Sequence, residues 1–354
     1  MTSSSTSAPI RLGLLDRLAR GPVICAEGYL FELERRGYLQ AGAFVPEVVL
    51  EHPDRVAALH EEFVHAGSDV VQAFTYYAHR EKLRVIGKDD LLELMNRQAL
   101  EIAGKVAIDS GTLLAGDICN TNIFDPANAE TPAQVRAIFD EQVGWAAEAG
   151  VDFIVGETFR YLDEALIALD AIRGADLPAV MMLNLHGVPE TREGIMLPVA
   201  MQRLADAGAD VVGLNCAWGP ATMLPLLGDL VDAVNVPVAA LPVPYRTDDE
   251  HPNFQALADP GYAGFPAGRP FPTGLDPFTC NRYEIADFTR AAHTAGVQYL
   301  GLCCGAAPHH IRSMAEALGR TPPASRYSED MSRHVYFGSE PTLARHNIVY
   351  GASL

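Results

Sequence analysis

The sequence predicts an α/β fold, a single (β/α)8 barrel with a C-terminal extension. Short apolar segments rich in β-branched residues recur eight times, and stretches with helical spacing lie between them. Near-continuous apolar runs of this length are typical of parallel strands that are buried on both faces. The length of 354 residues suits one barrel of about 250 residues with additions. Eight alternating repeats therefore favour a closed barrel.

The eight candidate strands each span four to eight apolar residues bounded by polar or glycine positions. They cover residues 22–28, 69–75, 113–118, 152–158, 179–185, 210–216, 236–242 and 297–304. Three intervening segments, 52–67, 131–150 and 197–208, combine helical spacing with a terminal Ala-Gly pair, a signal for a helix C-terminus. A doubly wound sheet is the structural alternative, but the segment 26–33 lacks the GxGxxG turn expected there.

Three segments fall outside the repeat. Residues 1–10 are small and polar, which predicts a disordered tail before a barrel over 11–320. The Pro/Gly-rich insertion 251–278 is long enough to be a functional loop or lid. Scattered aromatic residues in the extension 321–354 suggest docking on another subunit, so we expect a homo-oligomer.

Composition excludes several classes of partner. The 26 basic and 45 acidic residues give a net charge of −19, which repels nucleic acid and anionic lipid surfaces. No apolar run approaches the ~18 residues of a membrane span, and the N-terminus has no secretory signal. Six cysteines in such a chain indicate a reducing compartment, and we expect the cytoplasm.

Three cysteines stand at the predicted carboxyl ends of strands. Cys216 closes the sixth strand, and Cys303 with Cys304 closes the eighth, where Gly305 allows the backbone to turn. Catalytic groups of such barrels lie at this rim, so the three thiols should meet there. Three thiolates with an open fourth position suit Zn²⁺ and disfavour Mg²⁺ or Ca²⁺. A zinc-held thiol loses its proton and stays nucleophilic, which favours thiol alkylation.

Other interpretations remain open for these residues. A free cysteine is most often a small buried hydrophobe, and we expect that role for Cys25, Cys119 and Cys280. A zinc hydrolase is a rival function, but it should use histidine and carboxylate ligands. The only adjacent histidines, His309 and His310, follow Pro308 and are expected in an exposed first helical turn.

Several motifs resemble the cobalamin-independent homocysteine S-methyltransferases. GLNC at 213–216 and GLCCG at 301–305 look like the two zinc signatures of that family. The similarity runs from about residue 12 to 324 and is greatest to the betaine–homocysteine S-methyltransferase branch. The motifs that carry it are LERRGYLQAG, VVQAFTYYA, REKL, LHGVP, CCGAAPHHIRSMAEAL and PPAS.

The resemblance implies a TIM barrel with one zinc ion held by Cys216, Cys303 and Cys304. It also implies that homocysteine sulfur fills the open position, and that Glu157 holds the amino group of homocysteine. The position of Glu157 at the end of the fourth strand allows such a role, although an exposed rim carboxylate is the alternative. Asn215 is expected to orient its neighbours rather than to bind metal.

The second substrate is then a small methyl-onium donor, bound by an aromatic cage because a quaternary ammonium has no N–H to donate. Tyr77 and Phe44 resemble parts of the betaine donor pocket, although core packing is an alternative for both. The betaine branch has tryptophan at Phe44 and tyrosine at Thr158, and Ala26-Glu27 replaces its usual Asp-Gly pair. Glu27 is a further candidate for substrate binding. The alternatives to a betaine donor are a sulfonium donor, S-methylmethionine or dimethylsulfoniopropionate, and a non-enzymatic binder of methylated metabolites.

Overall fold

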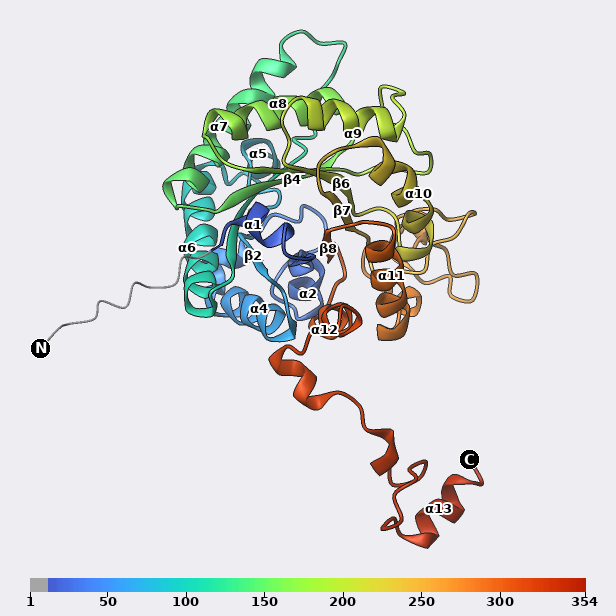
Figure 1. Cartoon of the computed structure of the whole chain (residues 1–354). Helices are drawn as coiled ribbons and strands as arrows, with labels where there is room; N and C mark the ends of the chain where they lie inside the picture. Colours follow the sequence, from blue (N-terminus) through green and yellow to red (C-terminus); the bar gives the residue numbers. More distant parts are fainter. Residues whose placement is uncertain (1–11) are drawn as a thin grey trace, which may run out of the picture.

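Eight parallel strands close into a barrel in sequence order, with β1 paired to both β2 and β8 (Figure 1). The computed structural model describes residues 12–354, so the predicted N-terminal tail lies outside the described residues. The predicted (β/α)8 fold is confirmed, and every predicted strand is present. The strands are β1 (Val23–Ala26), β2 (Val70–Gln72), β3 (Leu113–Cys119), β4 (Phe153–Phe159), β5 (Ala179–Leu183), β6 (Val211–Asn215), β7 (Val238–Leu241) and β8 (Tyr299–Leu302).

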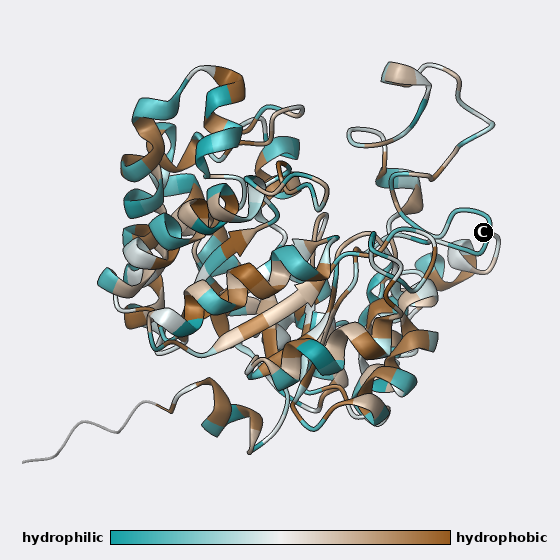
Figure 2. Cartoon of the chain, turned by 90° about the horizontal axis from the view of Figure 1, so that it is seen from above, coloured by the Kyte–Doolittle hydropathy of each residue, from teal (hydrophilic) through white to brown (hydrophobic). Residues whose placement is uncertain are grey.

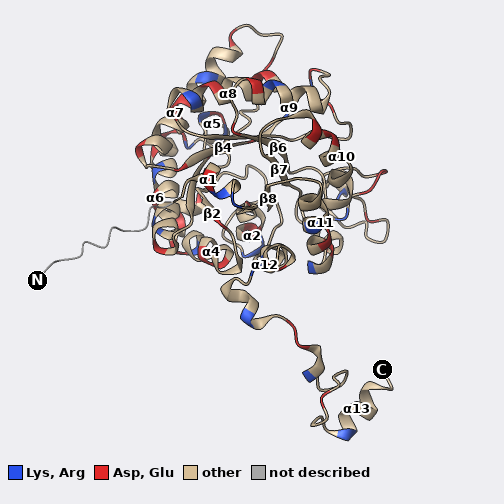
Figure 3. Ribbon diagram, viewed as in Figure 1, with Lys and Arg blue, Asp and Glu red and all other residues tan. Residues whose placement is uncertain are grey.

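Helices surround the strands and pack on one another around the ring (Figure 1). Charged residues are distributed over these outer helices (Figure 3). The α-helices are α1 (Leu14–Leu18), α2 (Tyr29–Arg35), α3 (Val48–Glu51), α4 (Pro53–Ala66), α5 (Arg80–Ile86), α6 (Leu92–Ser110), α7 (Thr131–Glu148), α8 (Leu162–Gly174), α9 (Leu197–Asp206), α10 (Pro220–Ala233), α11 (Arg282–Thr294), α12 (Pro308–Ala317) and α13 (Arg345–Gly351). The described residues also form five short 3-10 helices: η1 (Asp89–Leu91), η2 (Pro266–Gly268), η3 (Asp276–Phe278), η4 (Pro323–Tyr327) and η5 (Met331–Arg333).

The three helices predicted from sequence end where their glycines predict. Gly67, Gly150 and Gly208 follow α4, α7 and α9 with φ of 114°, 73° and 99°, a left-handed region that glycine enters without a Cβ clash. Each helix turns hydrophobic residues toward the strands and hydrophilic ones outward, and both kinds alternate along the helices in Figure 2. The sequence pattern thus determines both the period and the end of these helices.

Helix α1 closes one end of the barrel. Its Leu14 and Leu18 join a core cluster formed by inward-facing strand residues such as Val23, Phe153 and Tyr299. Phe153 and Tyr299 meet edge to face, with ring centroids 6.4 Å apart. The interior at this end is therefore filled by side chains, and the opposite end, at the carboxyl termini of the strands, is left to hold a site.

Two segments extend the barrel. The insertion 251–278 follows β7 at the mouth, and its Phe254 is buried and stacks on Tyr245 at 5.8 Å. The chain beyond α12 leaves the barrel as an arm that ends in α13 (Figure 1). Arg320 pairs with Asp69 at 2.6 Å where this arm begins. Beyond this point the arm exposes large apolar side chains: Tyr327, Met331, Val335, Tyr336, Phe337, Ile348, Val349, Tyr350 and Leu354.

Candidate metal centre

The three cysteines predicted to meet do so at the mouth of the barrel. Cys216 follows β6, Cys303 and Cys304 follow β8, and their sulfur atoms all lie within 4.8 Å of one another. The sulfurs of Cys303 and Cys304 are 3.9 Å apart. Two thiolates bound to one tetrahedral zinc at about 2.3 Å would be separated by about 3.8 Å. The observed spacing therefore fits a shared metal ion.

The backbone conformation at Cys216 and at Gly305 brings these sulfur atoms close together. Cys216 has a φ of 55°, and its N–H donates to the carbonyl of Leu241 on the neighbouring strand at 2.9 Å. Gly305 has a φ of 94°, and a Cβ at this position would overlap the hydroxyl of the buried Tyr245. The turn that brings the two adjacent cysteines together hence requires glycine, as the sequence predicted.

Glu157 on β4 lies beside the sulfurs and is only 3% exposed. Its Oε1 accepts a hydrogen bond from Gln72 Nε2 at 3.1 Å, and its Oε2 accepts one from Asn215 Nδ2 at 2.6 Å. Burial, with the negative charge of Cys216 as a smaller contribution, raises the pKa of Glu157 to about 7. Two amide donors thus hold the carboxylate in one orientation toward the cavity.

Two further carboxylates share this interior. Glu27 is 7% exposed and Asp117 is 4% exposed. Neither carboxylate oxygen of Glu27 has a hydrogen-bond partner among the described residues, and Oδ1 of Asp117 has none there either. Burial raises the pKa of both well above the usual range, and the charge of Glu157 raises it further. Unpartnered buried carboxylates are costly, which indicates a site that receives a cationic or hydrogen-bonding group.

A narrow cavity connects the carboxylates with the sulfurs. Its free volume is about 20 Å³, so an acceptor can enter only if wall side chains move. The wall consists of Glu27, Tyr29, Leu30, Gln72, Ala73, Phe74, Tyr76, Asp117, Glu157, Cys303 and Cys304. Glu27, Glu157 and Cys303 each bring one atom within 4.8 Å of the others. The predicted Glu27 and Glu157 are therefore brought together with the cysteines.

The predicted donor residues are more dispersed. The Tyr77 ring contacts the ring of Tyr76 at a tilt of 37°, with centroids 4.2 Å apart, and Tyr76 lines the cavity, so Tyr77 adjoins it. The Phe44 ring packs against the Phe31 ring, with centroids 6.0 Å apart. It lines a separate recess, whose walls come from residues in the range 38–88. Thr158 is buried with a φ of 60° and donates its hydroxyl proton to the carbonyl of Glu157. The structure does not place these three side chains around one cavity.

Some site residues were not singled out from the sequence. Asp117 lies inside the apolar run of β3, where an acidic residue is itself a signal because buried charges need a partner. Gln72 at the end of β2 is a similar signal. The side-chain Nδ2 of Asn215, which donates to Glu157, also lies 3.8 Å from the Sγ of Cys303, in line with the orienting role expected for this residue.

The exposed position expected for His310 is wrong. Helix α12 begins at Pro308 and His309 is exposed, but His310 is buried, with Nδ1 accepting from the Ala307 N–H and Nε2 facing the carbonyl of Cys280 at 3.0 Å. That carbonyl is distant in sequence, so periodicity could not reveal it. Cys25, Cys119 and Cys280 are buried as single thiols, outside the three-sulfur group found among the described residues.

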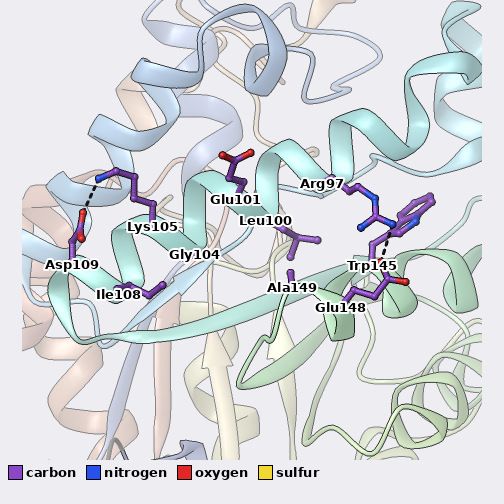
Figure 4. A pocket seen from close by; sticks show the side chains of 10 residues that line it. All are labelled: Arg97, Leu100, Glu101, Gly104, Lys105, Ile108, Asp109, Trp145, Glu148 and Ala149. Atoms are coloured by element: carbon purple, nitrogen blue, oxygen red, sulfur yellow. Dashed lines mark hydrogen bonds and ion pairs between the residues drawn. The ribbon is translucent and has the colours of Figure 1, made fainter. Parts of the chain in front are cut away.

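A second hollow lies on the outer helix layer between α6 and α7 (Figure 4). Trp145 lines it, and ion pairs join Lys105 to Asp109 at 2.7 Å and Arg97 to Glu148 at 2.8 Å. It contains no cysteine or histidine. Its location away from the strand ends separates it from the metal centre.

Comparison with known proteins identifies the family. The homocysteine S-methyltransferase family model matches residues 25–318. The chain belongs to the homocysteine S-methyltransferase family. As a member it is an enzyme that transfers a methyl group to homocysteine, rather than a non-enzymatic binder of methylated metabolites. No helix among residues 12–354 has the length and apolar character needed to cross a membrane.

Relatives of this homocysteine S-methyltransferase differ in their named donors. Betaine–homocysteine S-methyltransferase 1 of Rattus norvegicus is 36% identical, over 88% of this chain and 77% of the relative. S-methylmethionine–homocysteine S-methyltransferase of the same species is 35% identical, over 88% and 84%. The metallated homocysteine methyltransferase MmuM of Escherichia coli has a TM-score of 0.66 at 17% identity, covers 85% of this chain and 98% of its own, and supports the fold.

Proposed function

We propose that the protein is a zinc-dependent enzyme that moves a methyl group from a betaine-type quaternary ammonium donor to homocysteine and forms methionine. The observation that carries this proposal is the convergence of three cysteine sulfurs within 4.8 Å beside a cavity lined by buried carboxylates. A three-thiolate set leaves a fourth position for a substrate sulfur. No histidine belongs to this set among the described residues, which disfavours a zinc hydrolase.

Cys216, Cys303 and Cys304 would hold the metal ion. Zn²⁺ fits this donor set because soft thiolates select it over Mg²⁺ or Ca²⁺, and the sulfur spacing matches. When bound, it would keep the acceptor thiol deprotonated and nucleophilic at neutral pH. The remaining steps depend on side chains of the chain itself.

Glu157 would receive the ammonium group of homocysteine. Its carboxylate is held by Gln72 and Asn215, so it need not reorient when the substrate arrives. Glu27 and Asp117 supply two more acceptors around the same space. An ammonium group has three N–H donors, and the three carboxylates can satisfy them together.

The donor would approach from the rim beside Tyr77. The acceptor thiolate attacks the methyl carbon in line, and the leaving amine departs neutral, so opposite charges cancel as the transition state forms. Such a step is favoured where water is excluded, and the buried Tyr29 and Phe74 with the partly buried Tyr76 provide that environment. No general base acts at the carbon, and positioning supplies much of the rate.

A sulfonium donor is the second candidate. Relatives named for betaine and for S-methylmethionine are almost equally similar to this chain. Thr158 also offers less aromatic surface than the tyrosine of the betaine branch, and each lost cation–π contact costs roughly 0.5–2 kcal/mol. S-methylmethionine and dimethylsulfoniopropionate therefore belong in every donor assay beside glycine betaine.

We also propose a reducing cytoplasmic setting and a homo-oligomeric state. All six cysteines are free thiols, and oxidation would destroy the metal site. The exposed apolar residues of the arm support contact with another subunit. Light scattering of the purified protein would give the subunit number.

The test is a methionine-formation assay across a panel of betaines and sulfonium compounds, run beside metal analysis. Cys216→Ala should lose zinc and transfer activity, because two thiolates cannot complete the site. Cys280→Ala is the matched control, since that buried cysteine lies outside the cluster. Full zinc and full activity in Cys216→Ala would refute the metal assignment.

A further inference from the structure

The chain after β7 lies between the two turns that carry the clustered cysteines. Strand β7 pairs with β6 on one side and with β8 on the other. Leu241 is the last residue of β7, and its carbonyl accepts the N–H of Cys216 at 2.9 Å. The next carbonyl, that of Pro242, accepts the N–H of Cys303 at 3.0 Å. Two adjacent carbonyls thus fix the points at which both turns begin.

The turn at Cys216 has a conformation that its residues disfavour. Cys216 and Ala217 follow each other with φ of 55° and 46°, in the left-handed region where a Cβ crowds the backbone. Such a conformation persists only where the surrounding contacts determine it. One of these contacts comes from the insertion 251–278, because the N–H of Phe254 donates to the carbonyl of Ala217 at 2.9 Å. The insertion therefore holds the chain directly beside a candidate metal ligand.

Phe254 is also connected to the other cysteine turn, through Tyr245. The rings of Phe254 and Tyr245 stack with centroids 5.8 Å apart and an interplanar angle of 7°. Tyr245 is fully buried, and its hydroxyl lies against Gly305, where a Cβ would overlap it. Nη2 of Arg35 donates to this hydroxyl at 2.8 Å and fixes its place. Phe254 thus contacts one turn by its backbone and supports the other through a buried tyrosine.

The packing around Phe254 leaves its ring one place. The side chain is 2% exposed, and the rings of Phe31 and Phe271 lie 6.1 Å and 5.2 Å from it. Protein interiors are close-packed, so the ring cannot shift without displacing these neighbours. Neither Phe254 nor Tyr245 is part of the wall of the cavity beside the sulfurs. The two residues therefore act on the site through the turns and not by touching a substrate.

We propose that Phe254 and Tyr245 are positioning residues of the metal centre, which hold the turn of Cys216 against the turn of Cys303 and Cys304 and so slow the loss of the metal ion. Three thiolates bind one ion only while all three sulfurs stay within reach of it, so separation of the turns breaks the site. The insertion 251–278 then has a role in metal retention. This inference rests on the proposed function, because it takes the three cysteines as zinc ligands.

The rate of zinc release tests the inference directly. Zinc-loaded protein is diluted into excess 4-(2-pyridylazo)resorcinol, and the rate of colour formation gives the rate of release. Phe254→Leu keeps the backbone N–H and removes the stacked ring, so release should be roughly two- to tenfold faster. Tyr245→Leu should act similarly, and the double variant should add little, because both changes remove the same contact. Tyr245→Phe keeps the stack and should recover part of the wild-type retention.

Phe139→Leu is the matched control. Phe139 is fully buried on α7, and its ring packs on Phe159 of β4, a strand that lies across the barrel from β8 in the strand order. The same substitution at this position should lower the urea midpoint and leave zinc release at the wild-type rate. A wild-type rate in Phe254→Leu, or an equal acceleration in Phe139→Leu, would overturn the inference.

Thiol labelling separates a failure of the inference from a failure of the proposed function. If the wild type binds no zinc, the metal assignment fails, and the turns are compared in metal-free protein. Cys216 is buried, so N-ethylmaleimide can modify it only when its turn opens. Its modification, followed by peptide mass spectrometry, should be roughly two- to tenfold faster in Phe254→Leu and unchanged in Phe139→Leu. Equal rates in all three proteins would refute the inference.

Discussion

Replacing Asn215 by alanine should weaken both the fold and the acceptor site. Asn215 ends β6 directly before Cys216 and is 1% exposed. Its Nδ2 donates to Glu157 at 2.6 Å, and its Oδ1 accepts the N–H of Thr158 at 3.0 Å. Asn215→Ala leaves a buried carboxylate with one donor fewer and a buried N–H without an acceptor.

The magnitude follows from these two bonds. A hydrogen bond to a charged group contributes about 1.5–3 kcal/mol, and an unsatisfied buried amide costs about 1–3 kcal/mol. The free energy of unfolding should therefore fall by about 2.5–6 kcal/mol, toward the lower value if water enters the gap. The KM for homocysteine should rise by roughly tenfold, because Glu157 loses the contact that orients it.

Urea unfolding, zinc analysis and homocysteine kinetics would test this prediction. Asn120→Ala is the matched control: Asn120 is also buried and donates to the carbonyl and hydroxyl of Thr158, but its side-chain amide makes no hydrogen bond to Glu157 or to Cys216, Cys303 or Cys304. It should lower stability and leave the KM for homocysteine near the wild-type value. If Asn215→Ala kept the wild-type urea midpoint and KM, the orienting role of Asn215 would be refuted.

Three further variants address other parts of the structure. Gly305→Ala should lose zinc with little change in helix content by circular dichroism, since its Cβ overlaps the Tyr245 hydroxyl; retained zinc would contradict the required turn. Burial lowers the pKa of His60 to about 3 from 6.5, so the wild type loses stability as pH falls from 6.5 toward 3. His60→Leu should flatten this loss by up to about 1.4 kcal/mol per pH unit in urea titrations, and an unchanged slope would argue against a neutral His60. Phe44→Trp combined with Thr158→Tyr should shift kcat/KM toward glycine betaine over dimethylsulfoniopropionate, and an unaltered ranking would remove both positions from donor choice.

The fold could be predicted because each strand is an apolar run and each of the three marked helices ends at a glycine with positive φ. The clustering of Cys216, Cys303 and Cys304 could be predicted because these residues close strands, and the strand ends of a barrel converge. Side-chain partners across the barrel could not, because no local pattern links Gln72 to Glu157 or His310 to Cys280. The dispersion of Phe44 and Thr158 is likewise a property of loop paths, which periodicity does not encode.

Helix α1 has a consequence for the order of events in the catalytic cycle. Because Leu14 and Leu18 fill one end of the barrel, both substrates have to use the same entrance. The proposed acceptor lies deeper, beside Glu157, and the proposed donor lies nearer the rim, beside Tyr77, whose ring contacts Tyr76 of the cavity wall. A bound donor would then stand in the path of an arriving acceptor. Homocysteine should enter first, and methionine should leave only after the demethylated donor has gone.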